Sequence, residues 1–128
     1  MRLLLDTHAV LWWLAEPDRL SNAARSAIER PDTSIFLSSV VTAEIAIKHA
    51  IGRLKLPATP AELITALLRE HGFEPLALEH AHSLELGRLP LHHRDPFDRM
   101  LVAQCRIERL HLVSCDRSMG LYDVDILW

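Results

Sequence analysis

A chain of 128 residues with 49% hydrophobic and 24% charged residues has the size and composition of a packed globular protein, which excludes a disordered or fibrous one. Its formal net charge of -3 argues against a protein that coats nucleic acid, because such proteins are normally basic. We therefore expect residues 1–128 to form a single domain with one hydrophobic core.

We expect no membrane segment in this chain. The longest apolar stretches, residues 9–15 and 40–47, fall well short of the roughly 20 residues that a membrane span needs. Near the N-terminus, Asp6 ends the apolar run after only three leucines, whereas a signal peptide needs about 7 to 15 apolar residues. These features predict a cytoplasmic protein, in which Cys105 and Cys115 would be reduced and mostly buried thiols.

Short apolar runs and stretches with helical spacing alternate along the chain. In order, we expect a strand at 2–6, a helix from 7 to the proline at 17, a helix at 21–30, a strand at 34–38, a helix at 40–52, a helix at 60–72, a strand at 73–78, a helix at 79–88, a helix at 95–109, a strand at 111–114 and a short strand at 124–128. Strands that alternate with helices of this length indicate an α/β domain with a mainly parallel sheet.

Four acidic residues stand where such a sheet binds ligands. Ligands of an open parallel sheet bind outside the carboxyl ends of its strands, and Asp6 and Asp116 each follow a predicted strand. Glu44 and Asp98 belong to helices that we expect to begin at the same edge. Carboxylates that meet there would raise one another's pKa unless a hard cation with oxygen ligands neutralised them. The sequence therefore predicts an Mg²⁺ or Mn²⁺ site suited to phosphodiester hydrolysis.

On the residues alone, a structural role competes with metal binding for most of these acids. Asp6 could cap the helix that follows it, and Asp98 could complete a capping box or interact with the helix dipole. Asp116 could be a turn residue paired with Arg117. Glu44 lies close to an apolar stripe, which makes a solvated position less natural and favours a functional role.

Several segments of the sequence together resemble a known family. They are LLDTH at 4–8, TAEI at 42–45, HRDPFDRMLVAQ at 93–104, SCD at 114–116 and YDV at 122–124, followed by Trp128. In this order, and over essentially the whole chain, they resemble the PIN-domain family and in particular the VapC-type toxins of bacterial type II toxin–antitoxin systems. The segment 94–104 is the most specific part of the resemblance.

The resemblance implies a three-layer α/β/α sandwich with the activity of a magnesium- or manganese-dependent endoribonuclease. It also implies a toxin that cleaves RNA, is inhibited by a cognate VapB-like antitoxin and forms a homodimer. Asp6, Glu44 and Asp98 match the three core acids of the family, and Asp116 matches the more variable fourth. All four are thus expected to be catalytic metal ligands.

Three further residues are expected to support these ligands. Thr7 matches the hydroxyl that the family has beside its first acid, and Ser114 keeps a hydroxyl where the family often has threonine. Asp95 precedes Pro96 and a predicted helix, so we interpret it as an N-cap with a supporting role beside the metal.

Basic residues near the site are candidates for contacts with RNA phosphate. Of the 14 basic residues 12 are arginine, which suits phosphate recognition, and Arg94, Arg99 and Arg117 lie near the acids in sequence. Each could instead form a surface ion pair. His92 and His93 are expected to be solvent-exposed loop residues, because Mg²⁺ prefers oxygen ligands.

One alternative function stays open at this point. The acids could hold a structural cation or a basic segment of a partner in a non-catalytic binding module of the same fold. Such a module would bind metal or partner without turning over a substrate. A phosphatase of the haloacid-dehalogenase type fits poorly, because it needs an acid two residues after Asp6, where this chain has His8.

Overall fold

A five-stranded sheet forms the centre of the computed structural model, which describes residues 1–128. Its strands are β1 (Arg2–Leu5), β2 (Ser34–Ser38), β3 (Glu74–Leu76), β4 (His111–Val113) and β5 (Ile126–Leu127). They lie in the order β3-β2-β1-β4-β5, and every neighbouring pair is parallel. All predicted strands are present, and the prediction of a mainly parallel sheet is confirmed.

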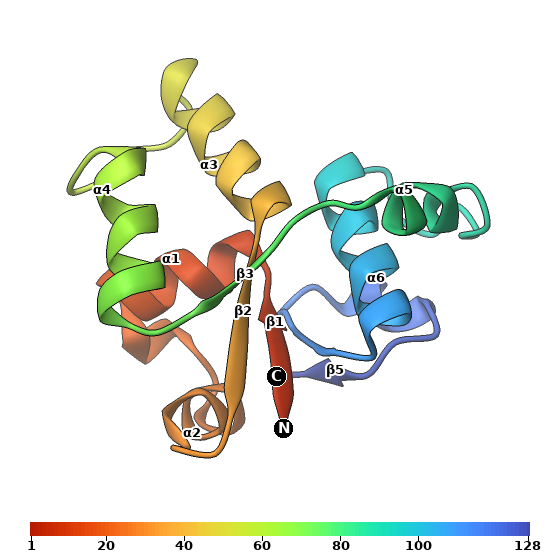
Figure 1. Ribbon diagram of the computed structural model, residues 1–128, viewed down its shortest axis with the longest axis horizontal. Coiled ribbons are helices and arrows are strands. Elements are labelled where there is room, and N and C mark those ends of the chain that lie inside the picture. Colours follow the sequence, from red (N-terminus) through yellow and green to blue (C-terminus); the bar gives the residue numbers. More distant parts are fainter.

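Helices cover both faces of this sheet. They are α1 (Thr7–Ala15), α2 (Asn22–Glu29), α3 (Ser39–Ala50), α4 (Pro60–Thr65), α5 (His80–Leu86) and α6 (Pro96–Glu108), with the 3-10 segments η1 (Pro17–Arg19) and η3 (Arg117–Leu121) and the π-helical turn η2 (Ala66–Glu70). Figure 1 shows α1, α2 and α4 on one side of the strands and α5 and α6 on the other. The fold is therefore the three-layer α/β/α sandwich that the resemblance implied.

Most predicted elements are a few residues shorter in the structure, and two of them differ further. The helix expected at 60–72 consists of α4 and the wider turn η2, which ends before Gly72, a glycine with a φ of 71°. The strand expected at 124–128 is reduced to β5, an edge strand that pairs only with β4. Before it lies η3, a short helix that the periodicity of the sequence did not predict.

The central strand β1 is buried on both faces. Leu3, Leu4 and Leu5 are completely buried, and the adjacent strand β4 adds the buried residues Leu112 and Val113. A parallel strand between two helical layers has no solvated face, which is why its sequence is continuously apolar and does not alternate. The core thus runs through the middle of the sheet and holds the strand ends in fixed positions.

Two findings bear on the expectations about thiols and membranes. Cys105 is buried in α6, and burial raises the pKa of its thiol far above the ordinary value. Cys115 is exposed, contrary to expectation, because it lies in the turn between β4 and η3. None of the helices combines the length and apolar composition that crossing a membrane requires.

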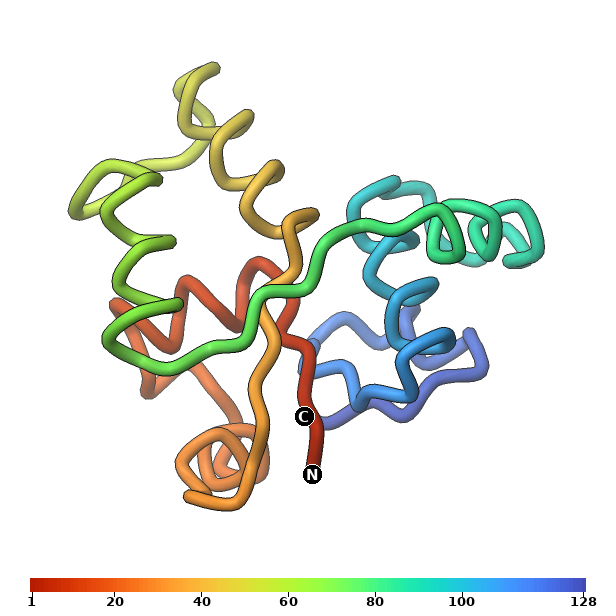
Figure 2. Tube along the Cα trace, viewed as in Figure 1, coloured from red at the N-terminus to blue at the C-terminus, as the bar shows by residue number.

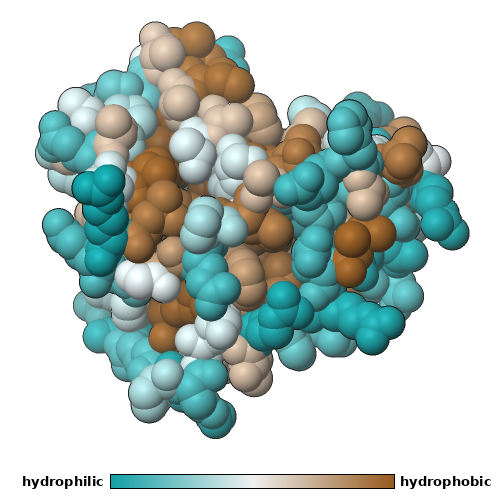
Figure 3. Space-filling view, viewed as in Figure 1, coloured by the Kyte–Doolittle hydropathy of each residue, from teal (hydrophilic) through white to brown (hydrophobic).

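The path of the chain brings several segments to the carboxyl edge of the sheet. α1 follows β1 after one residue, α3 follows β2 directly, and η3 begins close behind β4. Figure 2 shows that residues 73–79 carry the chain across to the side of α5, from which α6 then starts near the same edge. The space-filling view in Figure 3 shows a notch in the molecular outline between the lobe of α3 and α4 and the lobe of α5 and α6.

Candidate metal centre

Asp6 stands at the carboxyl end of β1 and is only 5% exposed. Its Oδ1 accepts a hydrogen bond of 2.9 Å from the backbone N–H of Ala9, so Asp6 caps α1 as the structural interpretation expected. Burial raises the pKa of this carboxyl and the nearby carboxylate of Glu44 adds to the effect, while hydrogen bonds from Ser114 and Ala9 lower it. A single cap bond leaves acceptor capacity on the carboxylate, so capping does not exclude metal binding.

Ser114 lies next to Asp6 because of the register of the sheet. Leu5 of β1 pairs with Val113 of β4, and the backbone N–H of Asp6 donates to the carbonyl of Val113. The next residue of each strand therefore lies at the same edge, and Ser114 is buried there. Its hydroxyl forms a hydrogen bond that lowers the pKa of Asp6.

Glu44 enters the site from α3 and is 4% exposed. Its Oε1 accepts a hydrogen bond of 2.6 Å from the hydroxyl of Thr7, and its Oε2 pairs with the ammonium group of Lys48 one helical turn later. The bond to Glu44 raises the pKa of Lys48, and the carboxylates of Asp95 and Asp98 add to it. Thr7 therefore fixes the second acid of the site, and Lys48 is a site cation that the sequence analysis missed.

Asp98 lies in the first turn of α6, behind the N-cap Asp95. Asp95 Oδ1 accepts from the N–H groups of Phe97 and Asp98 at 2.8 and 3.4 Å, which confirms it as the cap. The capping-box interpretation of Asp98 is wrong, because the N–H of Asp95, the group that such a box would use, donates instead to Nδ1 of His93. The side chain of Asp98 is therefore free of a capping role.

The electrostatic environment of Asp98 is strongly negative. Its pKa is raised to about 7, mainly by burial and then by the carboxylates of Asp95, Asp6 and Glu44, against an opposing effect of His93. A carboxyl group whose pKa is raised by burial and by neighbouring carboxylates lacks a full counter-charge in the protein. The charges of Asp6, Glu44 and Asp98 thus act on one another, as the predicted convergence at the strand ends requires.

Asp116 follows β4 and caps η3. Its Oδ1 accepts from the N–H and the hydroxyl of Ser118 at 2.9 and 2.7 Å, and its Oδ2 contacts Nε2 of His93 at 2.7 Å. These bonds, those of Ser118 first, lower the pKa of Asp116. The alternative of an ion pair between Asp116 and Arg117 is not realised, although Asp116 does lie in a turn. Three of roughly four acceptor positions of this carboxylate are in use, which leaves one for a metal ion or for a metal-bound water.

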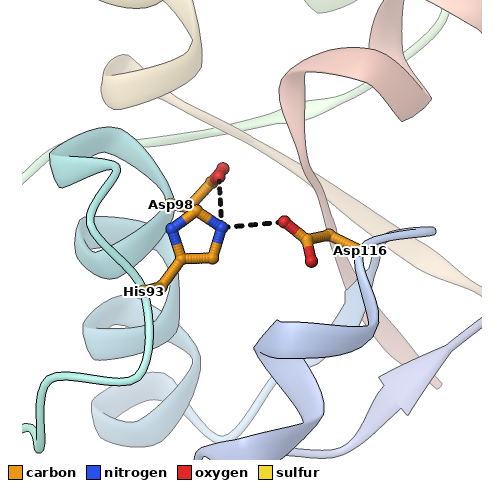
Figure 4. A group of neighbouring side chains, drawn as sticks. All are labelled: His93, Asp98 and Asp116. Carbon is orange, nitrogen blue, oxygen red and sulfur yellow. Dashed lines mark hydrogen bonds and ion pairs between the residues drawn. The ribbon is translucent and has the colours of Figure 1, made fainter.

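His93 is the residue that sequence reasoning placed wrongly. Its side chain is 16% exposed, and its Nε2 lies 2.7 Å from Asp116 and 3.3 Å from Asp98 (Figure 4). Ligand atoms of these three residues all lie within 4.8 Å of one another. The only signal in the sequence was the position of His93 inside the specific HRDPFD segment. His92, by contrast, is exposed as expected, with its ring against Tyr122.

The three candidate arginines have different surroundings. Arg99 is half-buried, and its Nη2 donates to the carbonyls of Leu86 and Leu89 at 3.4 and 3.3 Å, so its guanidinium holds the end of α5. Arg94 and Arg117 are exposed and form no ion pair. These two are the arginines with a guanidinium available to an incoming phosphate.

The donor set at this edge fits a hard divalent cation. Of its four carboxylates, those of Asp98 and Asp116 lie with Nε2 of His93 within 4.8 Å of one another, and those of Asp6 and Glu44, outside this group, interact with Asp98 through their charges. Carboxylate oxygens are the ligands that Mg²⁺ and Mn²⁺ prefer. The raised pKa of Asp98 comes first from burial and then from the neighbouring carboxylates, and a bound cation would offset the second of these causes.

A parallel sheet enclosed by helices, with acidic side chains gathered at its carboxyl edge, defines a class of α/β proteins built to bind ligands at strand ends. The PIN domain family matches residues 3–127, and the chain belongs to this family.

Two kinds of relatives agree with this assignment. The chain is 34% identical over 121 residues to "Ribonuclease VapC22" of Mycobacterium tuberculosis, an alignment that covers 91% of this chain and 88% of that protein. Its fold is similar to that of a chain in the crystal structure of VapBC2 from Rickettsia felis bound to a promoter DNA fragment, with a TM-score of 0.74 at 14% identity, covering 98% of this chain and 97% of that one. VapBC-5 from Mycobacterium tuberculosis has the same fold, with a TM-score of 0.61 at 17% identity over 98% of this chain and 96% of that chain.

Proposed function

We propose that this protein is a VapC-type endoribonuclease toxin that hydrolyses RNA phosphodiester bonds with the help of Mg²⁺ or Mn²⁺. The observation that carries the proposal is the group of acids at the carboxyl edge of the sheet, in a chain 34% identical to a protein named as a ribonuclease. The strongly perturbed carboxyl of Asp98 supports it, since perturbed acids in a cleft are typical of functional sites.

In this proposal Asp6, Glu44 and Asp98 hold the cation directly, and Asp116 contributes directly or through water. A divalent cation in such a site neutralises phosphate charge and makes water a better nucleophile at neutral pH. The protein positions the carboxylates in advance: Ala9 fixes Asp6, and Thr7 fixes Glu44. Little reorganisation is then needed when substrate and cation bind.

The exposed arginines Arg94 and Arg117 are proposed to contact RNA phosphates beside the acids. The formal net charge of the chain is -3, so attraction of RNA must come from local groups and the cation. Arg99 is not included, because its guanidinium already donates to two carbonyls of the protein. Replacing either exposed arginine is expected to weaken RNA binding and to reduce its dependence on salt.

Cleavage of total cellular RNA by the purified chain tests the proposal. The reaction is run with Mg²⁺, with Mn²⁺ and with a chelator, beside the variants Asp98→Asn and Asp18→Asn. Asp18 is a matched control, because its side chain is 98% exposed and lies on η1. Discrete products that need both metal and Asp98, but not Asp18, support the ribonuclease. Equal cleavage by Asp98→Asn in the presence of metal contradicts the assignment of the site.

The non-catalytic module remains the competing function. It predicts that metal binds and stabilises the protein but that no RNA is turned over under any condition. Metal titration of the same samples therefore separates the two: binding with cleavage supports the enzyme, and binding without cleavage supports the module.

We also propose a VapB-like antitoxin as the partner and a homodimer as the assembled state. The support is that the structural relatives are named as VapBC complexes and that this chain has an apolar groove between α1 and α4, with a volume of about 250 Å³. Leu11, Trp12, Leu56 and Leu63 are among the residues that line it. Light scattering of the purified chain, alone and after co-expression with a candidate antitoxin, tests both statements.

A further inference from the structure

His93 is held at three points, by groups at the two ends of η3 and at the start of α6. The phenol oxygen of Tyr122 accepts its backbone N–H at 3.0 Å, and the ring Nδ1 accepts the backbone N–H of Asp95 at 3.0 Å. The ring Nε2 then lies between the carboxylates of Asp98 and Asp116 (Figure 4). A side chain fixed on all sides in this way has one orientation, and a loop position alone does not explain it.

The bond from Asp95 determines which ring nitrogen carries the proton. A backbone N–H can donate only to a nitrogen with a free lone pair, so Nδ1 is unprotonated and the neutral ring has its hydrogen on Nε2. Nε2–H can therefore donate to Asp116, and Asp98 lies 3.3 Å from the same nitrogen. The same nitrogen has no lone pair left for a metal ion. Coordination through Nε2 would require the proton to move to Nδ1 and the bond from Asp95 to break.

The contact of His93 matters because it joins acids from different elements. Asp98 belongs to α6 and Asp116 to the start of η3, and Nε2 lies 3.3 Å from the first and 2.7 Å from the second. With Ser118 on Oδ1 of Asp116 and His93 on Oδ2, the plane of this carboxylate is fixed. Groups that orient ligands in this manner change metal affinity by roughly 10- to 100-fold when they are removed.

We propose that His93 is a positioning residue of the metal centre, whose Nε2–H holds the carboxylate of Asp116 beside that of Asp98 in the orientation that receives a divalent cation, and that it is not itself a ligand. The inference rests on the proposed metal-dependent function and adds a residue to it. Tyr122 supports His93 in turn, because its hydroxyl oxygen accepts a hydrogen bond from the backbone N–H of His93.

Manganese binding to the full chain tests this role, with isothermal titration for affinity and pulsed electron paramagnetic resonance for nitrogen coordination. His93→Leu removes the donor and keeps an apolar side chain of similar size. His93→Gln keeps an N–H donor at the same number of bonds from the backbone as Nε2. His92→Gln is the matched control, since His92 is the exposed neighbour in the same loop.

The expected result is a weakening of Mn²⁺ binding by roughly tenfold or more in His93→Leu, substantial recovery in His93→Gln and no change in His92→Gln. The wild-type complex is expected to show no directly coordinated nitrogen. Unchanged or tighter binding by His93→Leu would overturn the inference. So would a coordinated-nitrogen signal in the wild type that His93→Gln abolishes, because His93 would then be a ligand.

Failure of the inference and failure of the proposed function give different results. If the wild-type chain binds no Mn²⁺, the result contradicts both the proposed metal site and the proposed role of His93. If the wild type binds Mn²⁺ and His93→Leu binds it equally, only the role of His93 falls. If His93→Leu does not fold by circular dichroism, the resonance spectrum of the wild type and the affinity of His93→Gln decide.

Discussion

The hydroxyl of Thr7 donates a hydrogen bond of 2.6 Å to Oε1 of Glu44, and both side chains are buried. This contact joins the start of α1 to the middle of α3, so it fixes the second acid of the site relative to the first. A hydrogen bond to a charged, buried group contributes more than an average one, about 1.5–3 kcal/mol.

Thr7→Val should therefore lower the free energy of unfolding by about 1–3 kcal/mol. It should also reduce the rate of RNA cleavage by more than the loss of folded protein explains. Valine has nearly the shape of threonine but leaves the Glu44 carboxylate without its donor. Urea denaturation and cleavage assays on one preparation measure the two effects. Thr7→Ser is the control, because it keeps the hydroxyl. A valine variant with wild-type cleavage would show that Thr7 does not support the site.

The stability of the metal-free protein should fall as the pH rises from about 4 to about 7. The pKa of Asp98 is raised from 3.8 to about 7, so in this range the folded protein retains a proton that the unfolded chain has lost. The stabilisation from this proton is complete below pH 4 and absent above pH 7. Asp6 acts in the same direction, since burial raises its pKa as well.

Thermal denaturation in chelator at pH 5 and pH 8 measures this effect. Asp98→Asn should lose less stability than the wild type between these values, because an amide has no charge to bury, and should melt higher at pH 8. Each kcal/mol recovered corresponds to roughly 4 °C for a domain of this size. Equal slopes for the two proteins would mean that Asp98 does not titrate abnormally.

Divalent cations should raise the melting temperature of the wild-type protein, and a chelator should reverse the change. A ligand present at about 100 times its Kd and bound only to the folded state adds about 2.7 kcal/mol. The increase should be largely lost in Asp6→Asn, which keeps the hydrogen-bond acceptor for Ala9 but removes a charge. Differential scanning fluorimetry with Mg²⁺ and Mn²⁺ gives the comparison, and an increase of the same size in Asp6→Asn would exclude this residue as a ligand.

Gln104 should be important for the stability of the fold but not for metal binding. Its Oε1 accepts a hydrogen bond from the hydroxyl of the completely buried Ser38, and its Nε2 donates to the carbonyl of Ala77 at 3.3 Å. Gln104→Leu leaves the buried hydroxyl of Ser38 without its acceptor, at a cost of about 1–3 kcal/mol. Urea denaturation should show this loss, while Mn²⁺ affinity of the folded variant stays within about twofold of wild type. A large change in affinity would place Gln104 in the site.

The sequence predicts best those features that depend on neighbours along the chain. Asp95 before Pro96 is an N-cap by local chemistry, and Asp6 follows a strand that can only be central because it is apolar throughout. The fold class follows from alternating strands and helices. The order of the strands does not, because it depends on which surfaces meet after the helices pack.

The residues whose roles the sequence did not predict make contacts with segments that are distant along the chain. His93 looks like a solvated loop residue until β4 brings Asp116 beside α6, a contact that no local pattern encodes. Arg99 resembles a phosphate-binding residue, yet the end of α5 offers it two carbonyls. Lys48 is one turn from Glu44 and could have been found from this spacing.

The position of β1 in the middle of the sheet has a consequence for protein synthesis. Asp6 is synthesised long before its neighbour Ser114 and the last acid, Asp116, because both of these follow β4. A chain that ends before β4 therefore lacks Asp116 and the strand that pairs with β1 on one side. The acidic site can form only after β4 has been synthesised and has paired with β1.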